Sequence, residues 1–386
     1  MNTETVPVLL LTGYLGSGKT TLLNRILTNR KGIRFAVIVN DIGEVNIDAD
    51  LIQKGGVVTA QDDNLVALQN GCICCTLKMN LVQQLHDLCA QKIYDYIVIE
   101  ASGICEPAPI AQTLCSYPQI VDRSDAPVPV LDSIVTVVDA LRMRDEFASG
   151  HDLQKKDLGE DDLASLVIQQ IEFCNLILLN KASEVTPDEL KHIRAVIRAI
   201  QPKAEIIDCD YCDVPFSKLL DTQLFSFDEV AGSAAWIAGV EGDVDDDDDD
   251  DDHDEFHNEE EGEALEYGIS TFVYYRRKPM DLNRFDEFVA HHWPKSVIRC
   301  KGMCYFDSEY DMCYVFEQSG KQFNLKQAGA FYATMPKDEL RQALAQDPML
   351  RRDWDEQYGD RMQKLVFIGQ NMDKEAICKL LDDCLV

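Results

Sequence analysis

Short, unbroken apolar runs recur along the first half of the chain, and polar or charged stretches separate them. None of these runs alternates apolar with polar positions, so each predicts a strand that is buried on both faces. Strands of this kind belong to a parallel sheet that is covered by helices on both sides. The predicted strands are Val8–Leu11, Phe35–Val39, Tyr96–Ile99, Ile134–Val138 and Leu176–Leu179.

Amphipathic stretches between these runs predict helices. Thr186 followed by Pro187 is typical of an N-cap and a first helical position, and it marks the start of one of them. The predicted helices are Thr20–Thr28, Leu77–Cys89, Ser165–Glu172 and Pro187–Ala199. Helices that alternate with buried strands predict an α/β fold class.

Composition changes sharply after about residue 226. Residues 226–264 contain small residues and then an unbroken aspartate run, Asp245–Asp252, which predicts a disordered acidic linker. Loose attraction of divalent cations is the alternative role of this run. We therefore predict three parts, residues 1–225, 226–264 and 265–386.

The last part is predicted to be a smaller C-terminal α+β domain. Apolar runs predict strands at Ile269–Tyr275 and Met312–Phe316, whereas helical periodicity is present at Leu282–His291 and Lys374–Cys384.

The segment Gly13-Tyr14-Leu15-Gly16-Ser17-Gly18-Lys19-Thr20 matches the phosphate-binding pattern G-x-x-x-x-G-K-[ST]. It lies between the first predicted strand and the first predicted helix, which is the context that the pattern requires. Glycines allow backbone N–H groups to surround phosphate oxygens, and the helix N-terminus attracts their charge. Lys19 is expected to reach the β- and γ-phosphates, and the Thr20 hydroxyl is expected to bind Mg²⁺.

The motif refines the fold class to a P-loop NTPase with a mainly parallel sheet flanked by helices. The predicted nucleotide-binding residues of this segment are Gly13, Gly16, Ser17, Gly18, Lys19, Thr20 and Thr21.

Recognition of the base is less clear from the sequence. Asn180 and Lys181 follow a predicted strand, where GTPases carry an Asn-Lys-x-Asp element, and both are predicted to bind the nucleotide. Ser183 occupies the aspartate position and cannot form the charge-assisted bidentate pair that favours guanine. Glu184 could substitute from the next position. GTP is the predicted nucleotide, and ATP is the alternative.

Cys72, Cys74 and Cys75 place three thiols within four residues, just before a predicted helix. A helix N-terminus lowers the pKa of a thiol and favours the thiolate that binds metal. Three soft ligands suit Zn²⁺ or Cu(I) better than Mg²⁺ and leave a position for a further ligand. The alternative is a buried or redox-active pair, because Cys72 and Cys75 also have the C-x-x-C spacing.

Other cysteines are predicted to be structural. His291 and His292 with three later cysteines match no established zinc spacing. The cysteines expected to be small buried apolar residues are Cys89, Cys115, Cys174 and Cys378, and those near the histidines are Cys300, Cys304 and Cys313.

The formal net charge of −32 argues against a nucleic-acid partner, since phosphate binding needs a concentrated basic face. The first residues lack the pattern of a secretory signal, and no apolar run approaches the roughly 20 residues that span a bilayer. We therefore predict a cytoplasmic protein with no membrane partner.

Several motifs occur in one order along the chain: the phosphate-binding loop, Asn40-Asp41-Ile42-Gly43-Glu44, Gly71-Cys72-Ile73-Cys74-Cys75 and Glu100-Ala101-Ser102-Gly103. Together they resemble the CobW family of P-loop GTPases, which act as metallochaperones and metalloenzyme insertion factors. Trp293-Pro294, Arg299-Cys300-Lys301-Gly302 and Gly359-Asp360-Arg361 resemble the CobW C-terminal domain, and the arrangement is most similar to bacterial members associated with zinc limitation. The aspartate run, in place of a histidine-rich stretch, and Ser183 depart from the family pattern.

The resemblance implies roles for individual residues. The three clustered cysteines would bind the metal, and Glu44 would be an additional ligand. Glu100 would act with Lys19 in catalysis, near Mg²⁺ or the attacking water, and Gly103 would respond to the γ-phosphate. A carboxylate that ends a strand beside a phosphate-binding loop fits the same role on general grounds. A surface helix cap is the alternative role of Glu100.

These features predict a slow GTPase that binds zinc through the Cys-x-Cys-Cys motif and delivers it to a client metalloprotein, with transfer gated by GTP hydrolysis. The predicted cofactors are GTP, Mg²⁺ and Zn²⁺, with Co²⁺ as an alternative metal, and a homo-oligomer is compatible with the sequence. One alternative function is a zinc buffer or sensor with a regulatory nucleotide site. Another is a P-loop small-molecule kinase with structural cysteines.

Overall fold

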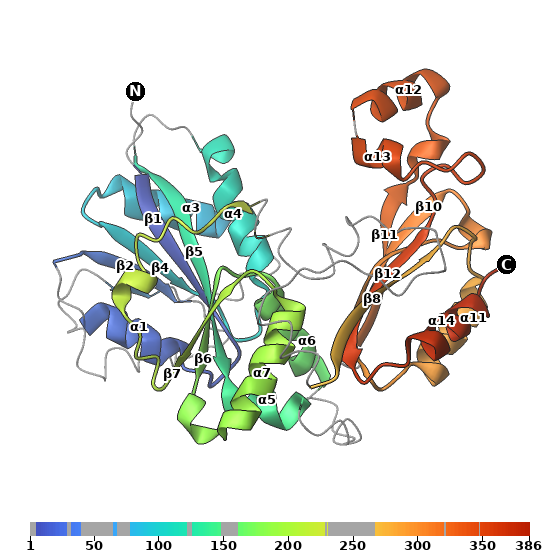
Figure 1. The fold of residues 1–386 in the computed structure, drawn as a ribbon. Coiled ribbons are helices and arrows are strands. Elements are labelled where there is room, and N and C mark those ends of the chain that lie inside the picture. The colour runs from blue at the N-terminus through green and yellow to red at the C-terminus, as the bar shows by residue number, and fades with distance from the viewer. Residues whose placement is uncertain are drawn as a thin grey trace. The chain divides into compact units, whose positions relative to one another are not determined.

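The computed structural model describes residues 5–28, 32–39, 65–67, 78–121, 126–147, 161–227, 230, 267–319, 322–346 and 348–386. The described residues divide into two units, each built around its own sheet (Figure 1). The predicted acidic linker lies outside the described residues except for Ser226, Phe227 and Val230. The predicted domain boundaries therefore stay predictions.

A seven-stranded sheet of order β3-β2-β4-β1-β5-β6-β7 forms the first unit, and all its neighbouring strands are parallel. Strands β2, β4 and β6 are buried at every position, because helices flank both faces of the sheet (Figure 1). This arrangement confirms the predicted α/β class. The strands are β1 Thr5–Thr12, β2 Phe35–Val39, β3 Leu65–Ala67, β4 Tyr96–Glu100, β5 Val128–Asp139, β6 Leu176–Asn180 and β7 Glu205–Cys209.

The helices of the first unit begin close to the predicted positions where a capping signal is present. Glu189 accepts a hydrogen bond of 2.7 Å from the backbone N–H of Thr186, and the Thr186 hydroxyl accepts one of 3.3 Å from that of Glu189. This reciprocal pair is a capping box, and it fixes the start of α7 at Pro187. The helices are α1 Lys19–Thr28, α3 Lys78–Ala90, α4 Pro107–Ile120, α5 Ala140–Phe147, α6 Asp161–Glu172 and α7 Pro187–Ile200.

The apolar side of α1 holds the phosphate-binding loop in place. Leu22, Leu23 and Ile26 are fully buried in one cluster with Leu9 of β1 and Val98 of β4. Full burial of such a side chain stabilises the fold by about 1.5–3 kcal/mol relative to exposure. The start of α1 is therefore fixed beside the end of β1. Because all the strands are parallel, the loops after β1, β4, β6 and β7 gather at the same edge of the sheet.

The second unit is an antiparallel sheet with helices, which confirms the predicted smaller α+β domain. Its five strands have the order β11-β10-β9-β12-β8, and every pair is antiparallel. The strands are β8 Ile269–Arg276, β9 Val297–Cys304, β10 Met312–Ser319, β11 Gln322–Ala330 and β12 Gln363–Gln370. The helices are α11 Leu282–Glu287, followed by a π-helical turn at Phe288–His292, α12 Lys337–Gln346, α13 Pro348–Arg352 and α14 Lys374–Asp382.

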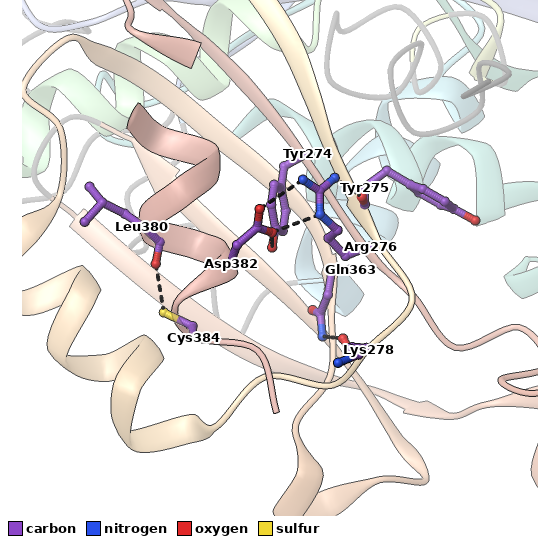
Figure 2. Close-up of polar contacts among 8 residues, drawn as sticks. All are labelled: Tyr274, Tyr275, Arg276, Lys278, Gln363, Leu380, Asp382 and Cys384. Carbon is purple, nitrogen blue, oxygen red and sulfur yellow. Dashed lines mark hydrogen bonds and ion pairs between the residues drawn. The ribbon is translucent and has the colours of Figure 1, made fainter. Parts of the chain in front are cut away.

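Helices α11 and α14 bury their apolar sides against one face of this sheet, where Phe285 and Leu381 lie in one cluster with Phe367. Polar contacts fix the end of α14 to β8 (Figure 2). Asp382 accepts hydrogen bonds of 2.9 and 3.0 Å from Nε and Nη2 of Arg276, and a third of 2.9 Å from the Tyr274 hydroxyl. A bidentate arginine–carboxylate pair fixes direction as well as distance, so α14 is held in one orientation.

The described cysteines mostly have the structural roles that the sequence predicts. Cys300 and Cys304 are fully buried, and burial raises the pKa of both thiols, so they remain neutral core residues. Among the described residues, no group of histidines, cysteines and carboxylates could hold a metal ion. Cys115 is exposed on α4, and the prediction that it is buried was wrong. Burial was inferred there from apolar neighbours in sequence, whereas Cys115 lies on the outer side of an amphipathic helix.

No helix in the part of the chain that the structure describes combines the length and apolarity needed to cross a membrane.

Candidate nucleotide site

The predicted phosphate-binding loop lies between the end of β1 at Thr12 and the start of α1 at Lys19. Gly18 has a φ of 118°, and a Cβ atom there would lie 2.5 Å from the Asn180 side-chain nitrogen and 3.0 Å from Cys212 Sγ. Only glycine fits this position, because a side chain would meet both a forbidden backbone conformation and two neighbours. The loop therefore packs directly on Asn180 at the end of β6 and on Cys212 after β7.

Two polar side chains of the loop fit the binding of phosphate. The Lys19 ammonium donates a hydrogen bond of 3.1 Å to the Tyr14 carbonyl, so it lies within the curve of the loop. The Ser17 hydroxyl is buried, and it has no hydrogen-bond partner among the described residues. A buried hydroxyl is seldom left without a partner, and a phosphate oxygen would supply one. Thr21, also predicted to bind the nucleotide, is exposed on the first turn of α1.

Glu100 ends β4, level with Leu11 of β1, and its side chain is almost fully buried at 2% exposure. Its Oε1 accepts a hydrogen bond of 3.1 Å from the Thr20 hydroxyl. The alternative role of a surface helix cap is therefore wrong, and the N-cap of the next helix is Glu106 instead. A hydroxyl beside a carboxylate is a pair of hard oxygen donors, which is the donor chemistry that Mg²⁺ prefers.

Gly103 lies against the phosphate-binding loop, as its predicted role requires. A Cβ atom at Gly103 would lie 2.7 Å from the backbone nitrogen of Leu15. The segment is held from the other side by Gln170 of α6, which donates hydrogen bonds of 3.2 Å to the carbonyls of Gly103 and Cys105. Residues 100–103 and the loop are thus in direct backbone contact, so a displacement of one must displace the other.

Asn180 connects three loops. Its side-chain nitrogen donates a hydrogen bond of 2.8 Å to the Ser17 carbonyl, and its Oδ1 accepts one of 3.0 Å from the backbone N–H of Cys212. The Cys212 thiol in turn donates to the Gly18 carbonyl at 3.4 Å. The adjacent Cys209 thiol and burial raise the pKa of Cys212, so the group stays protonated and able to donate.

Lys181, the second residue of the Asn-Lys element, has a left-handed backbone with a φ of 60°. Its ammonium forms an ion pair of 2.5 Å with Asp139 at the end of β5. The pair fixes the lysine side chain against the end of β5. Sequence reasoning missed Asp139, and no local pattern marks it, because it is 42 residues away from its partner.

A small pocket lies beside the loop, lined among others by Tyr14, Leu15 and Gln170. The Arg142 guanidinium carbon lies 4.2 Å from the centre of the Tyr14 ring, so a cation–π contact covers one side of this pocket. Arg142 and Gln170 were also missed by sequence reasoning, since both come from helices rather than from a motif.

The predicted metal ligands Cys72, Cys74, Cys75 and Glu44 lie outside the described residues. The first described residue after the cysteines is Lys78, where α3 begins, so the motif precedes a helix as the sequence predicts.

Comparison with known proteins agrees with this geometry. Residues 7–208 match the family of the CobW/HypB/UreG nucleotide-binding domain, and residues 269–385 match the cobalamin synthesis protein CobW C-terminal domain. The chain is 34% identical over 403 residues to a zinc-regulated GTPase metalloprotein activator 1 of Dictyostelium discoideum, with 99% of this chain and 80% of that protein covered.

Two further proteins are similar to this chain. The zinc chaperone CobW of Pseudomonas aeruginosa is 32% identical over 223 residues, which cover 56% of this chain and 59% of that protein. The Zn(II)-bound YjiA GTPase of E. coli aligns over the whole of both chains at 21% identity, with a TM-score of 0.43. The family matches confirm the predicted resemblance: the chain belongs to the CobW/HypB/UreG family of P-loop GTPases and carries a CobW C-terminal domain.

Proposed function

We propose that this chain is a GTP-hydrolysing metallochaperone that binds zinc through Cys72, Cys74 and Cys75 and delivers it to a client metalloprotein. Glu44 would be an additional ligand, and GTP hydrolysis would gate the transfer. The relatives named as a zinc chaperone and a zinc-regulated activator support the metal and the client. The proposal of GTP hydrolysis rests on one observation, the contact between Thr20 and the buried Glu100.

The residues of the site suit hydrolysis of a terminal phosphate. Backbone N–H groups of residues 13–18 and the start of α1 would surround the phosphates, and Lys19 would neutralise charge on the β- and γ-phosphates. Glu100 would orient the water that attacks, because its carboxylate lies at the end of a rigid strand beside the loop. Mg²⁺, held through the Thr20 hydroxyl near Glu100, would supply further neutralisation of phosphate charge when bound.

The strand register supports a coupling between nucleotide and metal. Val39, the last residue of β2, pairs with Glu100, the last residue of β4. The two strands therefore end side by side, and Glu44 follows Val39 by five residues in sequence. Contacts to the γ-phosphate in either segment would bias the other, which is how P-loop switches transmit hydrolysis.

The test is the affinity for Zn²⁺ in the presence of GDP and of a non-hydrolysable GTP analogue, measured by competition with a chromophoric chelator. We expect the two affinities to differ by about 5-fold or more, as is typical of coupled sites. Equal affinities would remove the gating, while the binding of zinc itself would still stand.

The ligand assignment has a matched control. Replacement of Cys72, Cys74 and Cys75 together by serine should abolish tight Zn²⁺ binding. Cys115→Ser should leave it unchanged, since Cys115 is an exposed thiol on α4. Tight binding retained by the triple variant would refute the ligand set.

The variant Lys19→Ala distinguishes a zinc carrier that is driven by GTP hydrolysis from a zinc buffer or sensor. This variant should still bind Zn²⁺ but should not release it faster to an acceptor chelator when GTP is added. If the release that GTP stimulates in the wild type persists in this variant, hydrolysis at this site does not drive transfer.

A further inference from the structure

The missing aspartate of the Asn-Lys-x-Asp element leaves the base without an obvious partner. Ser183 occupies its position in a short 3₁₀ turn, Ala182–Glu184, directly after Lys181. Glu184, the substitute considered from sequence, is exposed. The carboxylate beside Ser183 in the structure is that of Asp210.

Asp210 meets Ser183 across the sheet edge. Its Oδ1 accepts a hydrogen bond of 3.1 Å from the backbone N–H of Ser183 and a second of 2.9 Å from the Ser183 hydroxyl. The register of β6 and β7 explains this contact, because Asn180 at the end of β6 pairs with Cys209 at the end of β7. Asp210 therefore follows β7 as Lys181 follows β6.

The carboxylate of Asp210 differs from the two acidic side chains beside it in sequence. Asp208 forms an ion pair of 2.8 Å with Arg194, and Asp213 forms one of 2.7 Å with Arg25. Asp210 forms no ion pair with any described residue, and both of its hydrogen bonds are accepted by Oδ1. Its Oδ2 therefore remains able to accept from a ligand.

The loop that carries Asp210 is joined by hydrogen bonds to Asn180 and to the phosphate-binding loop. Tyr211 and Cys212 have left-handed backbones with φ of 52° and 54°. The Cys212 backbone N–H is bound by Asn180 and its thiol by the Gly18 carbonyl. The Asp213 backbone N–H donates to the Asp210 carbonyl at 3.0 Å. The carboxylate is thus held in place before any base binds, which reduces the entropic cost of recognition.

We propose that Asp210, positioned by Ser183, supplies the carboxylate that recognises guanine. This inference rests on the proposed GTP site. Guanine presents two donors on one edge, the N1–H and the 2-amino group, and a carboxylate can accept both. Adenine has an acceptor at N1 and no 2-amino group, so the same carboxylate repels it. Ser183 is a positioning residue, since it acts through Asp210.

The test is Asp210→Asn, with binding of GDP, XDP and ADP measured by displacement of a fluorescent nucleotide. The amide nitrogen cannot accept from the 2-amino group of guanine, but it can donate to the 2-oxo group of xanthine. We expect GDP affinity to fall and XDP affinity to rise, each by about 10-fold or more, as the loss or gain of a charged or buried hydrogen bond would produce. A gain of XDP binding cannot arise from misfolding.

The control is Asp208→Asn, which neutralises a carboxylate of the same strand end that is already paired with Arg194. It should leave the ratio of GDP to XDP affinity unchanged. If the wild type binds GDP and Asp210→Asn keeps the wild-type ratio, this proposal fails and the nucleotide site stands. If the wild type binds no nucleotide, the proposed function fails together with it.

Discussion

The hydrogen bond of 3.1 Å between the Thr20 hydroxyl and Glu100 Oε1 joins two segments that are 80 residues apart in sequence. Thr20 is the second residue of α1, and Glu100 is the last residue of β4. The contact exists because β1 and β4 are parallel neighbours whose carboxyl ends are level. It brings a hydroxyl and a carboxylate to the position where phosphate-binding loops hold their metal and water.

Glu100→Gln should slow GTP hydrolysis while nucleotide binding is retained. The amide keeps the size and the acceptor that Thr20 uses, but it removes the charge that we propose orients water and attracts Mg²⁺. We expect a decrease in kcat of about 100-fold, the lower end of what a positioned acid–base group contributes. Phosphate release under saturating GTP measures the effect.

Glu106→Gln is the control for Glu100, because Glu106 is a carboxylate on the same connection that makes no side-chain cap. Its hydrolysis rate should equal that of the wild type. If Glu100→Gln retained the wild-type rate, the carboxylate would have no part in the reaction.

Gly103→Ala should weaken GTP binding by displacing the phosphate-binding loop. The new Cβ would lie 2.7 Å from Leu15 N, 2.8 Å from Leu15 Cγ and 2.9 Å from Leu15 Cδ2, so backbone must move. Overpacking of this kind costs about 1–3 kcal/mol, which corresponds to a loss of affinity of about 5- to 150-fold if the loop bears the whole cost. Displacement of a fluorescent GTP analogue measures the change.

Leu15→Ala in the Gly103→Ala background provides the matching test, because two of the three close atoms belong to the Leu15 side chain. The double variant should recover part of the lost affinity. Unchanged GTP affinity in the single Gly103→Ala variant would contradict the prediction, because it would show that the two segments can move independently.

Local signals in the sequence account for the elements that were predicted correctly. The strand β2 was predicted with its observed bounds, because five apolar residues lie between Arg34 and Asn40. In contrast, β7 was missed. It lies at the edge of the sheet with an irregular burial pattern and contains Glu205 and Asp208, so it forms no apolar run. The strand β11 was missed because only Phe323 and Leu325 alternate with polar residues before a run of small and polar ones, and all of its residues are exposed.

In the candidate site, too, the sequence predicts one part and misses another. The phosphate-binding loop is continuous in sequence, so a pattern alone predicts it. The partners that complete the site are distant: Asn180 is 163 residues from Ser17, and Asp210 is 27 residues from Ser183. Only the parallel order of β1, β5, β6 and β7 brings these residues together, and strand order cannot be derived from a single sequence.

A buried ion pair in the C-terminal unit should make its stability depend on pH. Arg299 is fully buried and donates a hydrogen bond of 2.6 Å to Glu317, whose side chain is 17% exposed. Burial alone would raise the pKa of Glu317, but the Arg299 and Lys301 charges outweigh it and hold the pKa below its ordinary value. The ionised form is therefore favoured more strongly in the folded protein than in the unfolded chain.

The sign of the effect follows from that difference. As pH falls, the unfolded chain takes up the proton first, at about pH 4.3 for a free glutamate. The stabilisation is complete above this value and is lost as pH falls through the lower pKa of the folded state. Glu317→Gln should lower the free energy of unfolding by about 2 kcal/mol at pH 7, because it leaves a buried guanidinium without its charged partner.

Urea unfolding of the full chain at pH 7 and at several pH values below 5 tests this pair. The difference between wild type and Glu317→Gln should shrink steadily toward low pH, since protonation removes the same charge that the substitution removes. Asp338→Asn is the control, because its pair with Arg341 is exposed at 94% and 82% and should contribute little at any pH. A difference between wild type and Glu317→Gln that stays constant down to pH 3 would mean that packing of the amide, rather than loss of charge, causes the destabilisation.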